Sequence, residues 1–188
     1  MTLLIAGLVL FLGAHTFTTL RALRQRTIAR LGEGPYKGLY SAVSAAGLIM
    51  IVMGFGRYRA AGYLPVWDPP SWLHGVTLVL MWFAFVALAA TYSPLGKIKS
   101  SLRHPMLVSI KTWALAHLLV NGDLGSIVLF GAFLAWAVYD RIAVKRRGDV
   151  GVPASGVTAG DAIALVVGSA AYAAMWWLHP IAIGVPIG

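Results

Sequence analysis

The feature that most constrains this chain is a series of long apolar runs separated by short basic segments. A helix that crosses a bilayer needs roughly 20 apolar residues. Only 11% of the residues are charged, and the mean hydropathy is +0.79, whereas about a quarter of the residues in a soluble domain are charged. The pattern therefore predicts an all-α integral membrane bundle that forms a single domain over residues 1–188.

Six runs are candidates for membrane crossing. The expected spans are residues 2–20, 36–55, 71–92, a run from Pro105 to about Asn121, 124–144 and 161–178. The fourth run, at about 15 residues, is short for a full crossing. Basic loops are expected after the first, third and fifth runs. The aromatic, proline-rich segment 56–70 is expected to lie as a loop at the membrane interface.

The basic residues predict an orientation. Of the 15 Lys and Arg, all except Arg57 and Arg59 lie in the first, third and fifth loops, if Lys111 is counted with the third. Because cytoplasmic loops are enriched in Lys and Arg, both termini are expected on the non-cytoplasmic side of the inner (cytoplasmic) membrane. The net charge of +9 is therefore attributed to loops that face anionic membrane lipid, and no nucleic acid partner is expected.

Composition also limits the chemistry. The chain has no cysteine, which excludes disulfides and thiolate metal ligands. No pair of carboxylates suited to hydrolysis and no glycine-rich phosphate loop is visible. Asp123 and Asp161 are expected to cap helices. Histidine remains the best candidate for metal chemistry, because its neutral imidazole suits haem iron.

His15 lies inside the first apolar run. Its small neighbours Gly13 and Ala14 would let another helix or a planar ligand approach closely. The alternative is a histidine that only hydrogen-bonds a backbone carbonyl.

His117 lies inside the fourth run. It shares one helical face with Trp113 and Asn121, at i−4 and i+4. An aromatic ring, an imidazole and an amide in one stripe indicate either the wall of a pocket or a polar seam between helices.

The motif Arg103-His104-Pro105 resembles a helix start at the membrane interface. Proline is favoured at the first helical position. Arg103 is a candidate to face a phosphate or propionate, and His104 is a candidate supporting or acid–base group. Since thirteen positions of helix span roughly 20 Å, His104 and His117 cannot bind one metal together.

These elements together resemble the NnrU family. The resemblance rests on LGAHTFTTLRALR, SLRHPMLVSIKTWALAHLLVNGD and FGAFLAWAVYDR, and it runs from His15 to Arg141. The family includes the 15-cis-zeta-carotene isomerase, an integral membrane b-type haem protein whose iron isomerises a cis double bond of a polyene. Its small bacterial members are associated by name with nitrite and nitric oxide reduction, that is, with denitrification.

The resemblance implies a haem b with two axial histidines. They are His15, in the H-x-x-x-x-L-R element, and His117, in the W-x-L-A-H element. Sharing one iron requires both histidines to lie at the same membrane depth, so the fourth helix must tilt or enter the membrane near Lys111. The isomerase has a cysteine three residues before the second histidine, where this chain has Ala114, so a thiolate ligand switch is not expected.

On this interpretation, the iron would act on an apolar polyene as an isomerase or bind a small gas such as nitric oxide. The other cofactor-binding candidates are Trp113 along the macrocycle, Arg103 with Arg21 or Lys111 at the propionates, and Asn121.

Two other classes of function stay open. The chain could be a transporter or channel for a nitrogen-oxide species, with Lys111 and the basic loops as an anion path. It could also be an assembly partner of a respiratory or denitrification complex.

Overall fold

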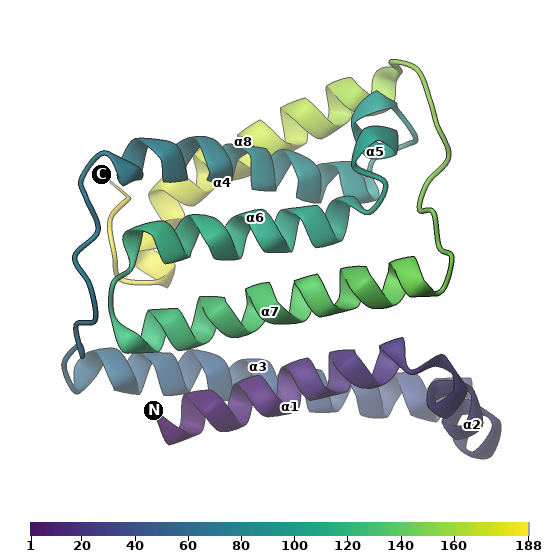
Figure 1. Ribbon diagram of the computed structural model, residues 1–188, viewed down its shortest axis with the longest axis horizontal. Coiled ribbons are helices and arrows are strands. Elements are labelled where there is room, and N and C mark those ends of the chain that lie inside the picture. The colour runs from purple at the N-terminus through teal and green to yellow at the C-terminus, as the bar shows by residue number, and fades with distance from the viewer. Residues whose placement is uncertain (188) are drawn as a thin grey trace. The chain divides into compact units, whose positions relative to one another are not determined.

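The computed structural model describes residues 1–187 and is all-helical over that range (Figure 1). Its helices are α1 (Thr2–Thr19), α2 (Arg21–Leu31), α3 (Glu33–Ala60), α4 (Leu73–Tyr92), α5 (Lys97–Leu102), α6 (Pro105–Val120), α7 (Leu124–Arg146) and α8 (Ala159–Ala182). The described residues form no strand, although Pro65 and Asp123 make one isolated antiparallel bridge. The expected all-α class is confirmed.

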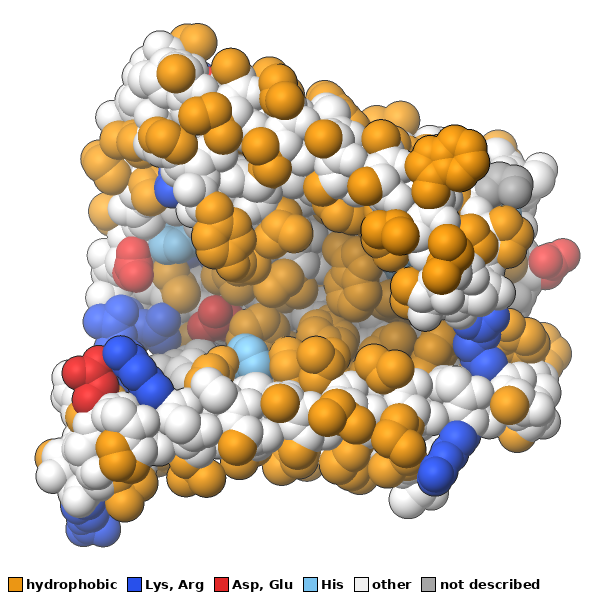
Figure 2. Space-filling model, turned by 180° about the vertical axis from the view of Figure 1, so that it is seen from behind, with side chains coloured by type: hydrophobic (Ala, Val, Ile, Leu, Met, Phe, Trp, Pro, Cys, Tyr) orange, Lys and Arg blue, Asp and Glu red, His pale blue; other side chains and the backbone are white. Residues whose placement is uncertain are grey.

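Five helices of the described range are long and apolar enough to cross a membrane, namely α1, α3, α4, α7 and α8. Helix α6 has 16 residues and is short, as expected. Large apolar side chains remain exposed, among them Val9 at 69%, Val52 at 65% and Val166 at 67%. Figure 2 shows hydrophobic side chains spread across the visible surface. Such a surface is stable in lipid and unfavourable in water, so the chain is a membrane protein. The orientation of its termini stays a prediction.

The basic segment after α1 is a helix, so the prediction of a loop there was wrong. Leu20 lies between the two helices and has non-helical backbone angles, φ −82° and ψ 71°. Helix α2 begins at the next residue. Arginine, alanine, leucine and glutamine all favour helix, and the segment contains neither proline nor glycine. Its charge keeps it out of the apolar region but does not prevent it from being helical. The loop after the third span, which is also basic, likewise contains a short helix, α5.

Helix α3 continues beyond the expected end of the second span. It begins at Glu33 and ends at Ala60, so Arg57 and Arg59 lie in its last turn. Gly62, with φ 93°, follows the helix. The long aliphatic stems of arginine can remain beside apolar surface while the charge reaches water, so these residues did not require a loop.

The helices group into two compact units. The first unit contains residues 1–69 and 121–147, with α1, α2, α3 and α7. The second contains residues 70–120 and the chain from Gly148 onward, with α4, α5, α6 and α8.

Glycines bring α1 and α3 of the first unit into direct backbone contact. A Cβ added to Gly7 would lie 2.6 Å from the backbone nitrogen of Ile51, and one added to Gly47 would lie 2.7 Å from that of Phe11. The later residue of α1, Phe11, meets the earlier residue of α3, Gly47, so the two helices are antiparallel. Lipid tails are as apolar as leucine, so helices in a membrane associate largely through such close van der Waals packing.

Asp123 ties together the ends of α3 and α7 in the first unit. As the N-cap of α7, its carboxylate accepts a hydrogen bond from the Ser126 amide at 3.0 Å. The Tyr58 hydroxyl of α3 also donates to it, and the Tyr58 oxygen accepts from the Leu64 amide at 3.0 Å. Burial raises the pKa of Asp123, but the hydrogen bonds from Ser126 and Tyr58 outweigh burial and hold that pKa below its ordinary value.

In the second unit, α4 packs against both α6 and α8 (Figure 1). Two buried hydroxyls cross from one helix to the other: Ser109 donates to the Ala84 carbonyl at 2.8 Å, and Thr77 donates to the Ala116 carbonyl at 3.1 Å. Between α4 and α8, the Trp82 indole donates to the Ser169 hydroxyl at 3.0 Å. Hydroxyl hydrogen bonds of this kind contribute to the association of membrane helices.

Asp161 caps two helices of the second unit at once. Its carboxylate accepts from the Thr158 amide at 2.8 Å in the capping box of α8. It also accepts from the Lys97 and Ile98 amides at 2.9 and 2.6 Å, at the start of α5. The expected capping roles of Asp123 and Asp161 are both confirmed, although the bonds from Asp161 to α5 could not be read from local sequence.

Enlarging Gly47 tests the α1–α3 contact. The Gly47→Ala variant should lose about 1–3 kcal/mol of stability, because its new methyl group meets backbone that cannot move aside. The matched control is Gly38→Ala in the same helix, where an added Cβ would have no atom within 4 Å. The control should be neutral or stabilising, since alanine favours helix over glycine. Thermal unfolding in detergent measures both, and equal melting temperatures for the two variants would contradict the packing.

The pH dependence of stability tests the Asp123 network. Its folded-state pKa lies below the unfolded value of about 3.9, so ionised Asp123 stabilises the fold at neutral pH. That contribution is lost as the pH falls through the folded-state pKa. The Asp123→Asn variant should therefore melt below wild type at pH 7 and converge with it in acid. Asp68→Asn, which removes an exposed carboxylate, is the control and should follow the wild-type curve.

Candidate functional site

His15 lies near the end of α1 among aromatic side chains of the first unit. Its Nδ1 is 2.7 Å from the carbonyl of Phe11. The ring centroid is 4.2 Å from that of Phe11, 5.4 Å from that of Tyr40 and 5.7 Å from that of Trp136. A Cβ added to the neighbouring Gly13 would meet no atom within 4 Å, so the backbone beside His15 is open to close approach.

Two of these aromatic neighbours, Tyr40 and Trp136, were missed by sequence reasoning. They come from α3 and α7, and no spacing in the sequence relates them to His15. The available signal was the presence of Trp136 within FGAFLAWAVYDR, one of the elements that carry the family resemblance. The Trp136 indole nitrogen is buried without a hydrogen-bond partner.

His117 lies near the end of α6 in the second unit. Its Nδ1 is 2.9 Å from the Trp113 carbonyl, and the two rings are 5.4 Å apart between centroids. The expected pairing of Trp113 and His117 is therefore present. Asn121 is the first residue beyond α6, so it does not continue the stripe as a helical residue.

The hydrogen bonds of His15 and His117 indicate one tautomer for both. A carbonyl oxygen only accepts, so each Nδ1 carries a proton, and in a neutral imidazole the lone pair is then on Nε2. Metal-binding histidines commonly have this arrangement, because a backbone carbonyl that holds one nitrogen orients the other.

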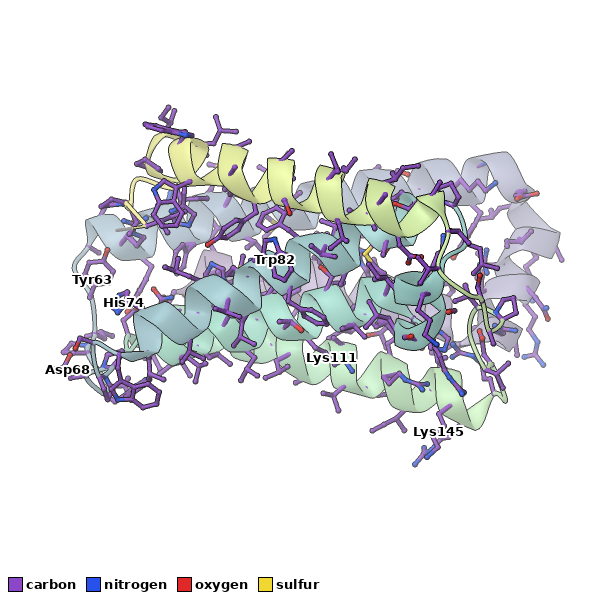
Figure 3. All side chains as sticks on the ribbon, turned by 90° about the horizontal axis from the view of Figure 1, so that it is seen from above. Tyr63, Asp68, His74, Trp82, Lys111 and Lys145 are labelled. Atoms are coloured by element: carbon purple, nitrogen blue, oxygen red, sulfur yellow. The ribbon has the colours of Figure 1, made fainter. Side chains whose placement is uncertain are left out.

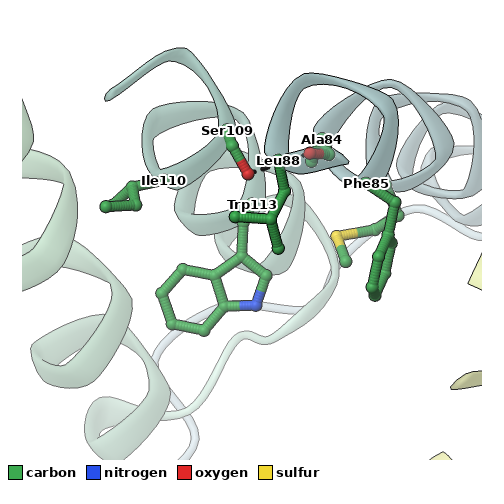
Figure 4. A pocket seen from close by; sticks show the side chains of 7 residues that line it. Ala84, Phe85, Leu88, Ser109, Ile110 and Trp113 are labelled. Atoms are coloured by element: carbon green, nitrogen blue, oxygen red, sulfur yellow. Dashed lines mark hydrogen bonds between the residues drawn. The ribbon is translucent and has the colours of Figure 1, made fainter. Parts of the chain in front are cut away.

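Trp113 also borders a groove between α4 and α6 (Figure 4). The volume of the groove is about 280 Å³, and the lining residues are Met81, Ala84, Phe85, Leu88, Ser109, Ile110 and Trp113. The Ser109 hydroxyl is already bonded to the Ala84 carbonyl. The groove therefore suits an apolar molecule.

The backbone at Arg103 is strained. Arg103 has φ 60° and ψ −46°, and it is the one non-glycine residue of the described range with positive φ. The His104 amide donates to the Leu102 carbonyl at 2.6 Å, which makes Arg103 the centre of a γ-turn of the rare, strained type. Pro105 then begins α6, as expected. Strained residues of this kind cluster at functional sites.

His104 is enclosed by the segment that precedes α8. A Cβ added to Gly151 would lie 2.5 Å from the Arg103 carbonyl oxygen and 2.9 Å from His104 Nε2. The Val152 amide donates to that same carbonyl at 3.2 Å. His104 Nε2 is buried and has no hydrogen-bond partner.

Two further candidates from the sequence are Lys111 and Arg21. Lys111 is half-buried on α6 (Figure 3), and because it follows Ser109 by two positions it lies on a different face from the groove. Arg21 is the exposed first residue of α2. Among residues 1–187, no group of three or more His, Cys, Asp or Glu is placed to hold a metal ion. A haem needs at most two axial side chains.

The strained turn makes a prediction about Arg103. Glycine adopts positive φ without steric cost, so Arg103→Gly should melt at a higher temperature than Arg103→Ala, which keeps the strain. The expected difference is about 1 kcal/mol, the lower end of the range for a strained residue. Thermal unfolding of the two variants measures it, and a less stable glycine variant would show that the turn is not strained.

Comparison with known proteins identifies the family. No curated protein and no solved structure shows significant similarity to the chain. A family model described as "NnrU protein" matches residues 3–187, which includes His15, the Arg103-His104-Pro105 turn and His117. The aromatic-flanked histidines described above therefore belong to a membrane protein of the NnrU family.

Proposed function

We propose that this protein binds haem b in the inner membrane, with His15 of α1 and His117 of α6 as the axial ligands. The observation that carries the proposal is the tautomer common to both side chains, with Nδ1 bonded to the carbonyl one turn earlier, at 2.7 Å for His15 and 2.9 Å for His117. That bond orients each ring and increases the basicity of Nε2, the nitrogen that would face the iron.

The surroundings of both histidines fit a flat, apolar group. Tyr40 and Trp136 flank His15, and Trp113 flanks His117. The open backbone at Gly13 gives a planar molecule room beside His15. Aromatic side chains supply large apolar contact surfaces, so they would cover a macrocycle and exclude water from it.

Basic side chains would neutralise the propionates. Arg103, with Arg21 or Lys111, is the candidate set, because charge-assisted hydrogen bonds from guanidinium or ammonium to carboxylate are strong. The γ-turn restricts the backbone of Arg103 and so limits the directions in which its side chain can extend. Asn121 and His104 remain candidates for supporting contacts.

The groove beside Trp113 would hold the substrate or ligand. Its mostly apolar lining would suit an apolar polyene or a small gas such as nitric oxide. When bound, haem iron supplies reversible coordination, which can promote cis/trans isomerisation of a polyene or capture a gas. Because position 114 is a buried alanine, the chain offers no thiolate there, and the histidines would be its only axial side chains.

Optical spectra of the purified protein test the proposal. After haem-replete expression, wild type should show a Soret band and the reduced spectrum of a low-spin b-type haem. The His15→Ala and His117→Ala variants should each lose the low-spin spectrum. His74→Ala is the matched control, because exposed His74 also has its Nδ1 near a backbone carbonyl, that of Ser71 at 3.3 Å.

Four results would contradict the proposal. They are the absence of a Soret band in wild type, an unchanged spectrum in both ligand variants, an equal loss in the His74→Ala control, and a loss in only one ligand variant. The last result would leave a haem with a single protein ligand and would exclude the paired arrangement.

A further inference from the structure

A second groove lies in the first unit, where α1 turns into α2. Its volume is about 240 Å³, and its lining residues are Ala14, Phe17, Thr27, Tyr36, Leu39, Tyr40 and Val43. Four of them follow one another on α3 at i, i+3, i+4 and i+7, so they form a single stripe. Since Gly47 of α3 meets Phe11 of α1, this stripe lies beside the end of α1 (Figure 1), and Thr27 of α2 lines the same groove.

Tyr36 is the unusual member of this groove. Its side chain is only 6% exposed, and its hydroxyl is buried without any hydrogen-bond partner. Nearly all buried polar groups in proteins are hydrogen-bonded, so each exception requires an explanation. A ligand in the groove that Tyr36 lines would supply the missing acceptor.

Positive charge lies next to the same groove. Helix α2 contains four arginines and no acidic residue. The Arg24 guanidinium carbon is 5.9 Å from the centroid of the Tyr36 ring. Glu33 interacts electrostatically with Arg24, and the Glu33 carboxylate is paired with Lys37 at 2.8 Å. The groove thus combines an apolar wall, a buried donor and a cation at its edge.

We propose that this groove binds one anionic diacyl phospholipid. An acyl chain would lie along the apolar stripe of α3, and the headgroup phosphate would pair with Arg24. An ester or phosphate oxygen would accept the hydrogen bond of Tyr36. Basic segments next to membrane helices attract anionic lipid, and a lipid covers the apolar wall, which a free anion would leave exposed.

Native mass spectrometry of the full chain, with equal amounts of palmitoyl-oleoyl phosphatidylglycerol and phosphatidylcholine, tests this proposal. Wild type should retain one phosphatidylglycerol in preference to phosphatidylcholine. The Arg24→Gln variant should lose about fivefold in that preference, the contribution of one basic residue at an anionic lipid surface. Tyr36→Phe, which keeps the ring, should also retain less phosphatidylglycerol.

The matched control is Arg26→Gln, which removes the same charge from the opposite side of α2, since two positions turn a helix by about 200°. It should keep the wild-type preference. An equal loss of lipid preference in Arg24→Gln and Arg26→Gln would mean that α2 attracts anionic lipid only by its overall charge, and this would overturn the proposed site. An unchanged preference in both Arg24→Gln and Tyr36→Phe would also overturn it, as would displacement of the lipid by glycerol phosphate alone.

The melting temperature in phosphatidylcholine shows whether each variant is folded. The Tyr36→Phe variant removes only an unpaired hydroxyl, so it should melt no lower than wild type there. None of the variants alters His15 or His117, and haem absorbance is measured separately. The experiments can therefore contradict the lipid site without contradicting the haem proposal, and they can contradict the haem proposal without contradicting the lipid site.

Discussion

The close packing of helices across small residues is the interaction on which the rest of this structure depends. In lipid, no general hydrophobic force brings helices together, so contact area and interhelical hydrogen bonds must do so. In the first unit, Gly7 and Gly47 let the backbones of α1 and α3 touch. In the second, Gly168 brings α8 against Val86 of α4.

Two of the few acidic residues cap the ends of helices. The chain has six Asp and Glu, and one of them caps helices in each unit. Asp123 connects the start of α7 to α3 through Tyr58. Asp161 connects the start of α8 to the start of α5. A carboxylate at a helix start accepts hydrogen bonds from backbone amides that have no partner within the helix, and its negative charge interacts favourably with the positive end of the helix dipole. These two residues therefore define where the helices begin.

The candidate site divides into a part that sequence reasoning found and a part that it could not find. His15 and His117 stood out because imidazoles inside apolar runs are costly, and Arg103-His104-Pro105 stood out as a motif. The aromatic neighbours of His15 did not, because Tyr40 and Trp136 reach it from other helices. The enclosure of His104 by Gly151 also depends on segments far apart in the chain, and no residue pattern signalled the positive φ of Arg103.

The sequence by itself determined that this is an all-helical membrane protein, roughly where its spans lie, and which residues are candidates for haem ligation. Apolar length and charge are local properties, so they can be read directly. The helix propensity of the basic segment after α1 is local as well, although that segment was expected to be a loop. The tertiary structure alone decided that the start of α5 is capped by Asp161, 63 positions beyond Ile98. It also decided that Tyr36 has no hydrogen-bond partner. These outcomes depend on which helices pack together. Every span has a similar pattern of apolar residues, so that pattern does not specify which helix packs against which.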